Sequence, residues 1–414
     1  MKVLVSGSGA GAQALAWKLL QSDSVDKVYL APGNPATEMD LRMENIPVKS
    51  SDIIGLARAA SELDVAYTLI TPTQTLASGV ADHFNDLGLP IIAPTKDASK
   101  LEWSKVYSKS FMNRHEIPTP KSMICKDKDE IIAFANSLSF PFVLKADGIV
   151  HGGTGVIIVS DQDEFDQAIN LVIVNEESQV LIEEFIMGEE VSYTIIYDGE
   201  NYVPLAESRD YKKLLNGNLG PNTGGMGAYS PVLTDDQHSI IRQNIIDPFI
   251  DSLKKDGVSY LGFLYFGVII DAYGNPYLLE VNCRLGNPEV FTILERLDSS
   301  LNDLFVSALN KKLENVKLSW SKKVSVALQI SSEGYPFVEK SGESISLPKV
   351  SGESHIFHSS VVSENGQLIS NGGRVIAIST TGSDFRDARE KLYNIAKQVK
   401  FEGMHYRTDI AENI

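Results

Sequence analysis

Short apolar runs separated by polar turns and amphipathic stretches occupy the first hundred positions of the chain. Strand-like runs lie at 3–5, 27–30, 67–70 and 90–93, and helix-like stretches lie between them at 12–20, 53–63 and 80–88. Alternation of strands and helices predicts a parallel sheet that is covered by helices on both faces. We therefore expect a small doubly wound α/β domain that ends near Pro94.

The next part of the chain combines a helix with two strands that flank a glycine-rich turn. The helical pattern spans 100–115, and the strand-like runs span 141–148 and 156–159. The turn between the two strands holds Gly152, Gly153 and Gly155, and Lys145 lies on the strand before it. Backbone amides of such a turn can close over phosphates, and a lysine on the leading strand can contact them. An ordinary hairpin loop is the alternative.

Two further segments have patterns that suit ligand binding. The apolar run 180–186 passes into an acidic turn that includes Glu190, so its backbone could bind an adenine and a carboxylate could bind a ribose. The stretch 220–231 is rich in glycine and poor in apolar residues, which predicts a ligand-enclosing loop rather than a core element. Other expected elements are an antiparallel pair at 192–197 and 202–207, a helix at 237–255 and a strand at 262–271.

The stretch 277–289 carries the clearest metal-site pattern. It begins as an apolar strand, on which Glu280 and Asn282 are two positions apart and therefore point to the same face. A carboxylate beside a carboxamide suits a cation that prefers oxygen ligands, such as Mg²⁺. Arg284 continues this face and could hold an anion next to the metal. An edge strand with a solvated polar face is the alternative.

After Leu313 the chain changes to short strands joined by segments rich in serine, lysine and glutamate. Strands are expected at 324–330 and 373–378, and a helix is expected at 384–399. This pattern predicts a separate α+β C-terminal domain. Its turn at 371–374 places Arg374 where it could reach a shared cleft.

Composition narrows the class of protein. The chain has 414 residues, a 43% hydrophobic fraction and a formal net charge of −17, which argues against a nucleic-acid-binding protein. No apolar run approaches the roughly 20 residues of a membrane helix, and Met1 leads into a strand rather than a signal peptide. With Cys125 and Cys283 as its only cysteines, the chain offers no disulfide framework or zinc cluster, so we expect a cytoplasmic protein.

The order of these motifs resembles that of ATP-grasp carboxylate–amine ligases, and specifically the phosphoribosylamine–glycine ligase (glycinamide ribonucleotide synthetase) family of purine biosynthesis. The most specific matches are 220–231, 262–265 and 280–284, with others at 104–105, 145–148, 371–374 and 407–410. The resemblance implies a multidomain α/β and α+β protein with an ATP-grasp fold. Its expected parts are a doubly wound (pre-ATP-grasp) α/β domain at 1–100, an ATP-grasp domain at 101–317 with a flap at about 121–185, and a C-terminal α+β domain at 318–414.

The resemblance also implies the chemistry and its residues. A carboxylate attacks ATP to give an acyl phosphate, and an amine displaces the phosphate. The expected cofactors are ATP and Mg²⁺, with Mn²⁺ as a substitute, and Glu280 and Asn282 are the expected metal ligands. ATP is expected at Lys105, Lys145, Gly152, Gly153, Gly155, Glu183, Phe185, Ile186 and Glu190. The expected catalytic residues are Arg284, Asp210 and Lys212. Substrate contacts are expected at Gly9, Gly11, Asn222, Thr223, Gly224, Gly225, Met226, Asn287 and Arg374.

Departures from the family pattern lie on the substrate side. The loops at 7–14, 71–74 and 148–155 differ from it, with Thr73 and Thr154 where the family has glutamate and lysine, and Asn287 replaces an aspartate. Three functions therefore remain: the standard ligation of glycine to 5-phosphoribosylamine, ligation of another amine or carboxylate, and nucleotide binding without catalysis. The partners are small molecules in the first two cases, and the protein is expected to be a monomer or homodimer.

Overall fold

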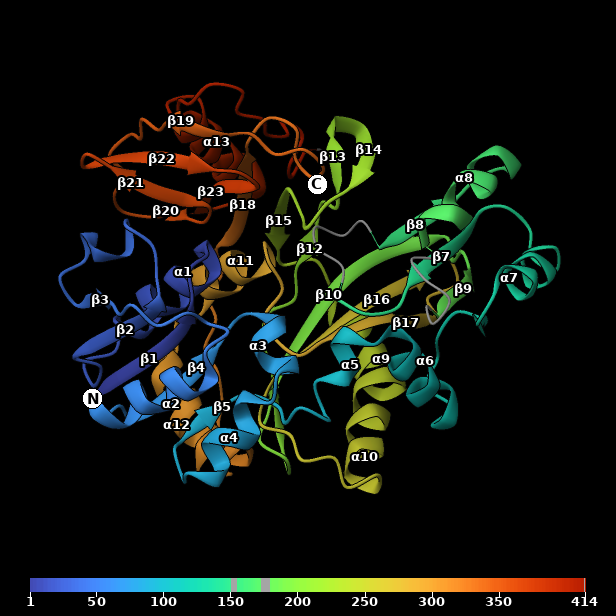
Figure 1. The fold of residues 1–414 in the computed structure, drawn as a ribbon, viewed down its shortest axis with the longest axis horizontal. Coiled ribbons are helices and arrows are strands. Elements are labelled where there is room, and N and C mark those ends of the chain that lie inside the picture. Colours follow the sequence, from blue (N-terminus) through green and yellow to red (C-terminus); the bar gives the residue numbers. More distant parts are fainter. Residues whose placement is uncertain (150–154, 173–178, 413) are drawn as a thin grey trace.

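The N-terminal part of the computed structural model is a five-stranded parallel sheet between two layers of helices (Figure 1). The model describes residues 1–149, 155–172, 179–412 and 414. The strand order is β3 (Met43–Asn45), β2 (Lys27–Pro32), β1 (Lys2–Gly7), β4 (Tyr67–Ile70) and β5 (Ile91–Ile92). The helices are α1 (Ala10–Leu19), α2 (Ile53–Glu62), α3 (Thr73–Ala77) and α4 (Val80–Asp86). Val3, Leu4 and Val5 are fully buried, as expected for a central parallel strand, and the predicted doubly wound unit is confirmed.

Two short helices, α5 (Lys100–Trp103) and α6 (Lys105–Arg114), connect this unit to the rest of the chain. The sequence predicts one helix over 100–115, but the helix breaks at Ser104, whose backbone is extended (φ −116°, ψ 105°). The Ser104 hydroxyl accepts a hydrogen bond from the backbone N–H of Tyr107 at 3.1 Å and so caps α6. A cap of this kind competes with helix continuation, which explains the difference.

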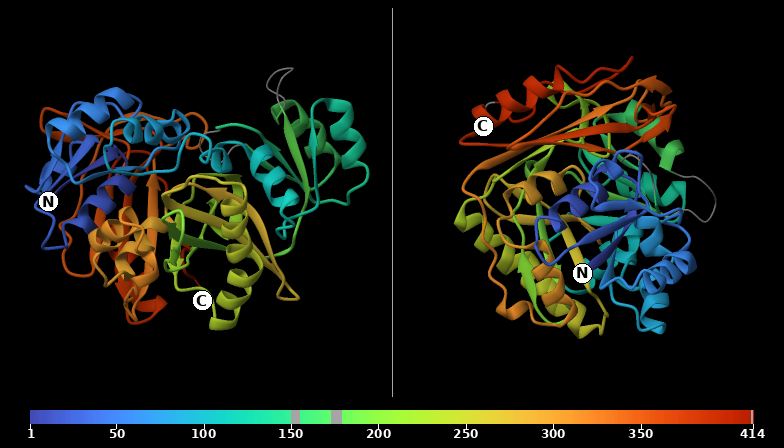
Figure 2. Two further views of the ribbon diagram at one scale, coloured as in Figure 1. Left: turned by 90° about the horizontal axis from the view of Figure 1, so that it is seen from below. Right: turned by 90° about the vertical axis from the view of Figure 1, so that its left-hand side faces the viewer.

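A small outer sheet, which we call the flap sheet, lies at one end of the molecule with its two helices (Figure 2, left). Its antiparallel strands are β6 (Ser122–Cys125), β9 (Val180–Glu184), β7 (Phe142–Ala146) and β8 (Val156–Val159), in that order. Helices α7 (Lys128–Ala135) and α8 (Gln162–Val172) pack on it through Ile131, Phe165 and Ile169, which are buried with Phe142 and Leu144. The flap sheet therefore has a hydrophobic core of its own.

The central antiparallel sheet lies between the flap sheet and the N-terminal unit (Figure 1). Its strand order is β11 (Tyr202–Pro204), β10 (Gly188–Tyr197), β16 (Gly262–Asp271) and β17 (Pro276–Asn282). Helices α9 (Asp235–Ile241) and α10 (Asp247–Lys255), joined by a π-helical turn over Arg242–Ile246, pack on this sheet, with the Phe249 and Phe266 rings 5.0 Å apart. The pairing of β16 with β17 shifts at a bulge, so that Gly267 faces Glu280 but Val268 faces Leu278. Bulges of this kind re-aim side chains near functional sites.

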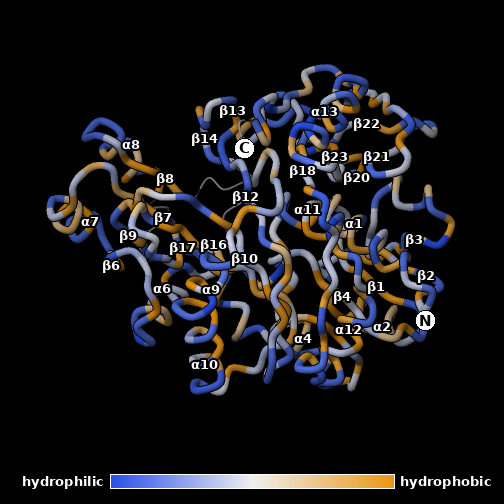
Figure 3. Tube along the Cα trace, turned by 180° about the vertical axis from the view of Figure 1, so that it is seen from behind, coloured by the Kyte–Doolittle hydropathy of each residue, from blue (hydrophilic) through white to orange (hydrophobic). Residues whose placement is uncertain are grey.

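The C-terminal sheet takes strands from two distant parts of the chain. Its order is β12 (Arg209–Asp210), β15 (Gly227–Ser230), β18 (Val324–Ser331), β23 (Arg374–Gly382) and β20 (Ser354–His358), and α11 (Glu289–Arg296) and α13 (Phe385–Ala396) contact it. Three smaller parts complete the described fold. Two of them are the helix α12 (Leu301–Leu309) and the hairpin of β13 (Lys213–Leu215) and β14 (Leu219–Asn222). The third is a sheet with the strand order β19 (Ser341–Ser344), β22 (Gln367–Asn371) and β21 (Val361–Glu364). Hydrophobic residues concentrate in the inner strands and helices, whereas the outer connections are mostly hydrophilic (Figure 3).

The expectation that 220–231 contains no core element is wrong for its second half. Residues Gly227–Ser230 form a fully buried strand that pairs with β18. Glycine is required at its start, because a Cβ on Gly227 would lie 2.7 Å from Cδ1 of Ile410 and 2.8 Å from the carbonyl oxygen of Ala327. The glycines in this segment therefore include one that serves close packing, which composition alone does not distinguish from a flexible loop.

Candidate active site

A cleft of about 740 Å³ lies between the flap sheet, the central sheet and the start of α6. Among the expected nucleotide and metal residues, its lining includes Lys105, Lys145, Gly155, Glu183, Phe185, Ile186, Glu190, Glu280 and Asn282. Among the expected catalytic and substrate residues, it includes Asp210, Lys212, Arg284, Asn222, Thr223, Gly224 and Asn287. Gly152 and Gly153 lie outside the described residues. The fold therefore brings together residues that are up to 182 positions apart in the sequence, from Lys105 to Asn287.

The floor of the cleft contains a buried ion triad of Lys109, Glu183 and Lys145. The Glu183 carboxylate lies 2.6 Å from Nζ of Lys109 and 2.6 Å from Nζ of Lys145. All three residues are buried, with 1–8% of their surface exposed. Burial raises the pKa of Glu183, but the two lysines outweigh this effect and hold the pKa below its ordinary value. Burial lowers the pKa of Lys109 to about 8, although Glu183 opposes the shift.

The triad also joins three elements. Lys145 Nζ donates a hydrogen bond to the carbonyl oxygen of Leu279 at 3.0 Å, at the bulge in β17. Lys109 Nζ donates to the Thr119 hydroxyl, which in turn donates to the carbonyl oxygen of Leu278 at 2.7 Å. The flap sheet, α6 and the central sheet are thus fixed to one another beside the cleft. Lys109 was not among the expected site residues, since its only signal was a second lysine one helical turn after Lys105.

Glu280 and Asn282 both line the cleft from β17, as their spacing predicts. Burial raises the pKa of Glu280, but Lys212, Lys145 and Lys105 outweigh this and lower it. Nζ of Lys212 lies 3.7 Å from the Glu280 carboxylate. Within the described residues there is no group of three or more histidine, cysteine, aspartate or glutamate side chains that could hold a metal. A cation at this pair would therefore need further oxygen ligands, which suits Mg²⁺ bound together with phosphates and water.

Lys212 connects the metal pair to two other carboxylates. It forms an ion pair with Glu190. Burial alone would lower the pKa of Lys212, but the nearby carboxylates of Glu190, Asp210 and Glu280 outweigh this effect and raise the pKa well above its ordinary value. Burial raises the pKa of Asp210 well above its usual value, although Lys212 opposes the shift. This edge of the cleft therefore gathers three acidic groups around one lysine.

Arg284 is held by Thr73 of the N-terminal unit and by Glu102 of the connecting helix α5. Its Nε lies 3.0 Å from the Glu102 carboxylate and donates a hydrogen bond to the Thr73 hydroxyl at 3.2 Å. The Thr73 hydroxyl also donates to Glu102 at 2.7 Å, and the second oxygen of Glu102 accepts from the backbone N–H of Cys283 at 2.8 Å. Sequence reasoning missed Glu102, because nothing in its local pattern distinguishes it from a solvated helix residue. Thr73, by contrast, occupies the position that the departures from the family pattern singled out.

The remaining expected substrate residues lie outside the lining of the cleft. Arg374 Nη1 donates to backbone carbonyl oxygens of Gly224, Gly225 and Asn287, and Met226 is fully buried. Gly225 has φ +101°, and a Cβ there would lie 2.4 Å from Cδ of Pro288. In this structure these residues support the loop that carries Gly224, and their contact with substrate stays a prediction.

Gly9 and Gly11 lie at the start of α1 and face the C-terminal part of the chain. A Cβ on Gly11 would lie 3.7 Å from Nδ2 of Asn287, and a Cβ on Gly9 would lie 3.5 Å from the Ser359 hydroxyl. Gly9 caps α1 without a side-chain hydrogen bond, and the N–H groups of Ala12 and Gln13 donate to its carbonyl oxygen. The earlier N–H groups of this helix start, at Ala10 and Gly11, are the ones suited to an anion. This part of the N-terminal loop therefore lies next to Asn287, which lines the cleft.

Comparison with protein families gives three matches that together cover most of the chain. Residues 1–102 match the N domain of phosphoribosylglycinamide synthetase, residues 103–290 its ATP-grasp (A) domain, and residues 325–413 its C domain. Phosphoribosylamine–glycine ligase of Vibrio vulnificus is 39% identical over 419 residues, which cover 99% of this chain and 97% of that protein. The enzyme of the same name from Ralstonia nicotianae is 39% identical over 418 residues, with 99% and 98% covered.

Solved structures agree with these matches. The crystal structure of phosphoribosylamine–glycine ligase from Thermotoga maritima has a TM-score of 0.82 and 31% sequence identity, and the match covers 99% of this chain and all of that one. The biotin carboxylase domain of Hydrogenobacter thermophilus 2-oxoglutarate carboxylase, solved with MgADP and bicarbonate, has a TM-score of 0.68 at 18% identity and covers 97% of this chain. The second likeness shows a shared fold alone.

The triad predicts a role for Lys109 that can be tested by substitution. In Lys109→Met, Glu183 would neutralise Lys145 completely, so less positive charge would remain for nucleotide phosphates. We expect the Kd for MgADP, measured by calorimetry, to rise about tenfold, which corresponds to about 1.4 kcal/mol. The control is Lys100→Met, since Lys100 is partly exposed and pairs with Asp97 outside the cleft. Equal MgADP affinity in Lys109→Met and the wild type, at temperatures where both are folded, would contradict this role.

Proposed function

This chain belongs to the phosphoribosylglycinamide synthetase family. We propose that it uses ATP to join glycine to 5-phosphoribosylamine and releases ADP and phosphate. The reaction forms a C–N bond, as in other ATP-grasp carboxylate–amine ligases. The observation that carries the proposal is the cleft itself, where Glu280 and Asn282 lie beside Lys105, Lys145 and Lys212. Similarity over the full length of the relatives supports the same reaction.

The residues of the cleft fit ATP and Mg²⁺. Glu280 and Asn282 would hold the metal, which when bound neutralises phosphate charge and aligns the transferred phosphoryl group. Lys105 and Lys145 would contact the phosphates, together with backbone amides near Gly155. Residues 183–186 would contact the adenine through the backbone at Phe185 and Ile186, and Glu190 would bind the ribose. In this account the Glu183 side chain fixes the two lysines rather than contacting the nucleotide.

The chemistry requires alignment and charge stabilisation more than a protein nucleophile. Arg284, oriented by Glu102 and Thr73, would hold the carboxylate or the acyl phosphate. Lys212 would stabilise charge at the reacting phosphate, and Asp210, whose pKa burial raises, could exchange a proton with the amine. Cys283 is buried and its pKa is raised by burial, so it is unsuited to a nucleophilic role.

The amine substrate would lie between the N-terminal loop and the loop that carries Asn222, Thr223 and Gly224. Gly9 and Gly11 would supply backbone donors for its phosphate, because the family's charged side chains are absent from this loop. Asn287, whose Oδ1 accepts from Nε2 of Gln329 at 2.9 Å, would complete this end of the site. Gly225, Met226 and Arg374 would act by supporting these loops.

The altered loops kept two other functions open, namely ligation of a different substrate pair and nucleotide binding without catalysis. Full-length similarity to phosphoribosylamine–glycine ligases supports the standard reaction over both. Among the described residues, no helix is long and apolar enough to cross a membrane. We further propose a cytoplasmic protein, either a monomer or a homodimer, whose three domains follow the division at 1–100, 101–317 and 318–414.

The substrate assignment predicts the outcome of a comparison between substrate pairs. ADP release should be fastest with glycine and freshly generated phosphoribosylamine, when these are assayed beside a panel of other amino acids and amines. Backbone donors at Gly9 and Gly11 replace the lost side chains in this account, so the standard pair should remain preferred. Higher turnover with another pair would instead establish the altered-substrate function.

The metal assignment predicts the effect of Glu280→Gln. Loss of a charged ligand costs roughly 1.5–3 kcal/mol, so the rate of ADP formation should fall about tenfold to 100-fold or more at limiting Mg²⁺. The melting temperature should change little, because Glu280 is partly exposed. Glu200→Gln is a matched control, since Glu200 is exposed and pairs with Lys311 away from the cleft. A Glu280→Gln enzyme with near wild-type turnover at limiting Mg²⁺ would disprove the assignment.

A further inference from the structure

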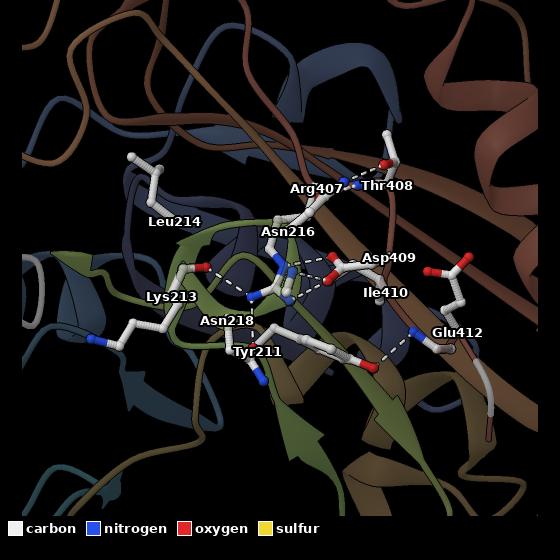
Figure 4. A network of polar contacts seen from close by, with 12 residues as sticks. Tyr211, Lys213, Leu214, Asn216, Asn218, Arg407, Thr408, Asp409, Ile410 and Glu412 are labelled. Carbon is white, nitrogen blue, oxygen red and sulfur yellow. Dashed lines mark hydrogen bonds and ion pairs between the residues drawn. The ribbon is translucent and has the colours of Figure 1, made fainter. Parts of the chain in front are cut away.

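The C-terminal segment 405–411 packs against the hairpin of β13 and β14, which leads into the cleft (Figure 4). We call this segment the C-terminal clamp. Its centre is Arg407, whose side chain is 1% exposed. Nη1 of Arg407 donates to the carbonyl oxygen of Lys213 at 3.0 Å and to Oδ1 of Asn218 at 3.0 Å. One guanidinium thus contacts the first residue of β13, which pairs with Asn222 at the open end of the hairpin, and the last residue of the turn that precedes β14.

Asp409 fixes the orientation of this guanidinium. Nε and Nη2 of Arg407 donate to the two Asp409 oxygens at 2.7 Å and 2.6 Å, which is a bidentate pair. Asp409 also accepts from the backbone N–H of Gly217 at 2.8 Å, and Arg407 lies over the Tyr211 ring, 4.7 Å from its centroid. The fork geometry of arginine is needed here, because a lysine cannot make these contacts together.

Further contacts join the clamp to the hairpin along its length. The backbone N–H of Thr408 donates to Oδ1 of Asn216 at 2.9 Å, while Nδ2 of Asn216 donates to the Thr408 hydroxyl at 2.6 Å. The backbone N–H of Ala411 donates to the Tyr211 hydroxyl at 2.9 Å, and His405 Nε2 lies 3.0 Å from the carbonyl oxygen of Leu214. The clamp therefore contacts the hairpin turn, strand β13 and Tyr211, which lies two residues before that strand.

The residues held in this way adjoin the catalytic edge of the cleft. Tyr211 lies between Asp210 and Lys212, which both line the cleft. The carbonyl oxygen of Lys212 accepts from the backbone N–H and the hydroxyl of Thr223, each at 2.8 Å. Asn222, at the end of the hairpin, donates from Nδ2 to the carbonyl oxygen of Val156 at 3.0 Å, at the start of β8. The hairpin thus connects the clamp to both the substrate loop and the flap sheet.

We propose that Arg407 is a positioning residue for the ligation reaction, and that it sets the place of Lys212 and of the loop 222–224 through the hairpin. The inference rests on the proposed function, because those residues are assigned to the reacting phosphate and the amine substrate. The adenine is assigned to residues 183–186 at the end of β9. Within the part of the chain that the structure describes, no hydrogen bond or ion pair joins these residues to the clamp, and the hairpin reaches the flap sheet through β8 instead. Arg407 should therefore affect turnover and substrate binding far more than nucleotide binding.

The test compares Arg407→Lys and Asp409→Asn with Glu412→Gln as a matched control. Glu412 lies in the same terminal segment, is exposed and pairs with Arg389 rather than with the hairpin. Asp409→Asn keeps the shape of the clamp while weakening its bidentate pair, so it serves if Arg407→Lys fails to fold. For each protein, kcat, the KM for phosphoribosylamine, the Kd for MgADP and amide hydrogen exchange over 211–223 are measured below the melting temperature.

In the clamp variants we expect kcat to fall at least tenfold and exchange over 211–223 to increase, with the Kd for MgADP within about threefold of wild type. Wild-type kcat and exchange in folded variants would overturn the inference. An equal loss of MgADP affinity would also overturn it, since that indicates a general structural defect. If the wild-type protein itself does not turn over glycine and phosphoribosylamine, the proposed function fails. The exchange of 211–223, and kcat with whichever pair is active, would then still decide the inference.

Discussion

The buried triad of Lys109, Glu183 and Lys145 is the interaction on which the geometry of the cleft depends. Two lysines share one carboxylate beneath the cleft, so the group as a whole keeps a positive charge where an anion can use it. Buried charges of this kind are energetically costly unless they are paired. Displacement of one element would therefore leave buried charges on the other elements without a partner, which is strongly unfavourable. The triad therefore fixes the flap sheet against α6 and β17.

The same arrangement recurs across the cleft. Arg284 is held by Glu102, and Lys212 is held by Glu190, so each cation is oriented by a carboxylate from a different element of the fold. Such pairs place the cations before any ligand arrives. Preorganised charge is the main source of catalysis in phosphoryl transfer, where the protein supplies little covalent chemistry. The C-terminal clamp extends this arrangement, because it orders the hairpin beside Lys212.

The sequence was enough to predict the architecture and to predict that the two proposed metal ligands lie on one strand. Buried runs predicted the parallel sheet, and a two-residue spacing placed Glu280 and Asn282 together. Lys109 and Glu102, which fix Glu183 and Arg284, were not predictable, because they acquire these partners only through tertiary contacts. The bulge in β17 and the buried strand at Gly227–Ser230 were missed because each depends on pairing with a distant strand. The break at Ser104 is different, because it comes from a local serine cap that the helical pattern of the surrounding residues concealed.

The most direct test of this account is the Kd for MgADP in Glu183→Gln, measured by calorimetry below the melting temperature of the variant. Removal of one negative charge makes the cleft more positive, which by itself would strengthen binding of an anion. If Glu183 acts by holding Lys145 and Lys109 in place, the loss of position outweighs the gain in charge. The account predicts binding at least about tenfold weaker, or about 1.4 kcal/mol. Unchanged or tighter binding in a folded variant would contradict it.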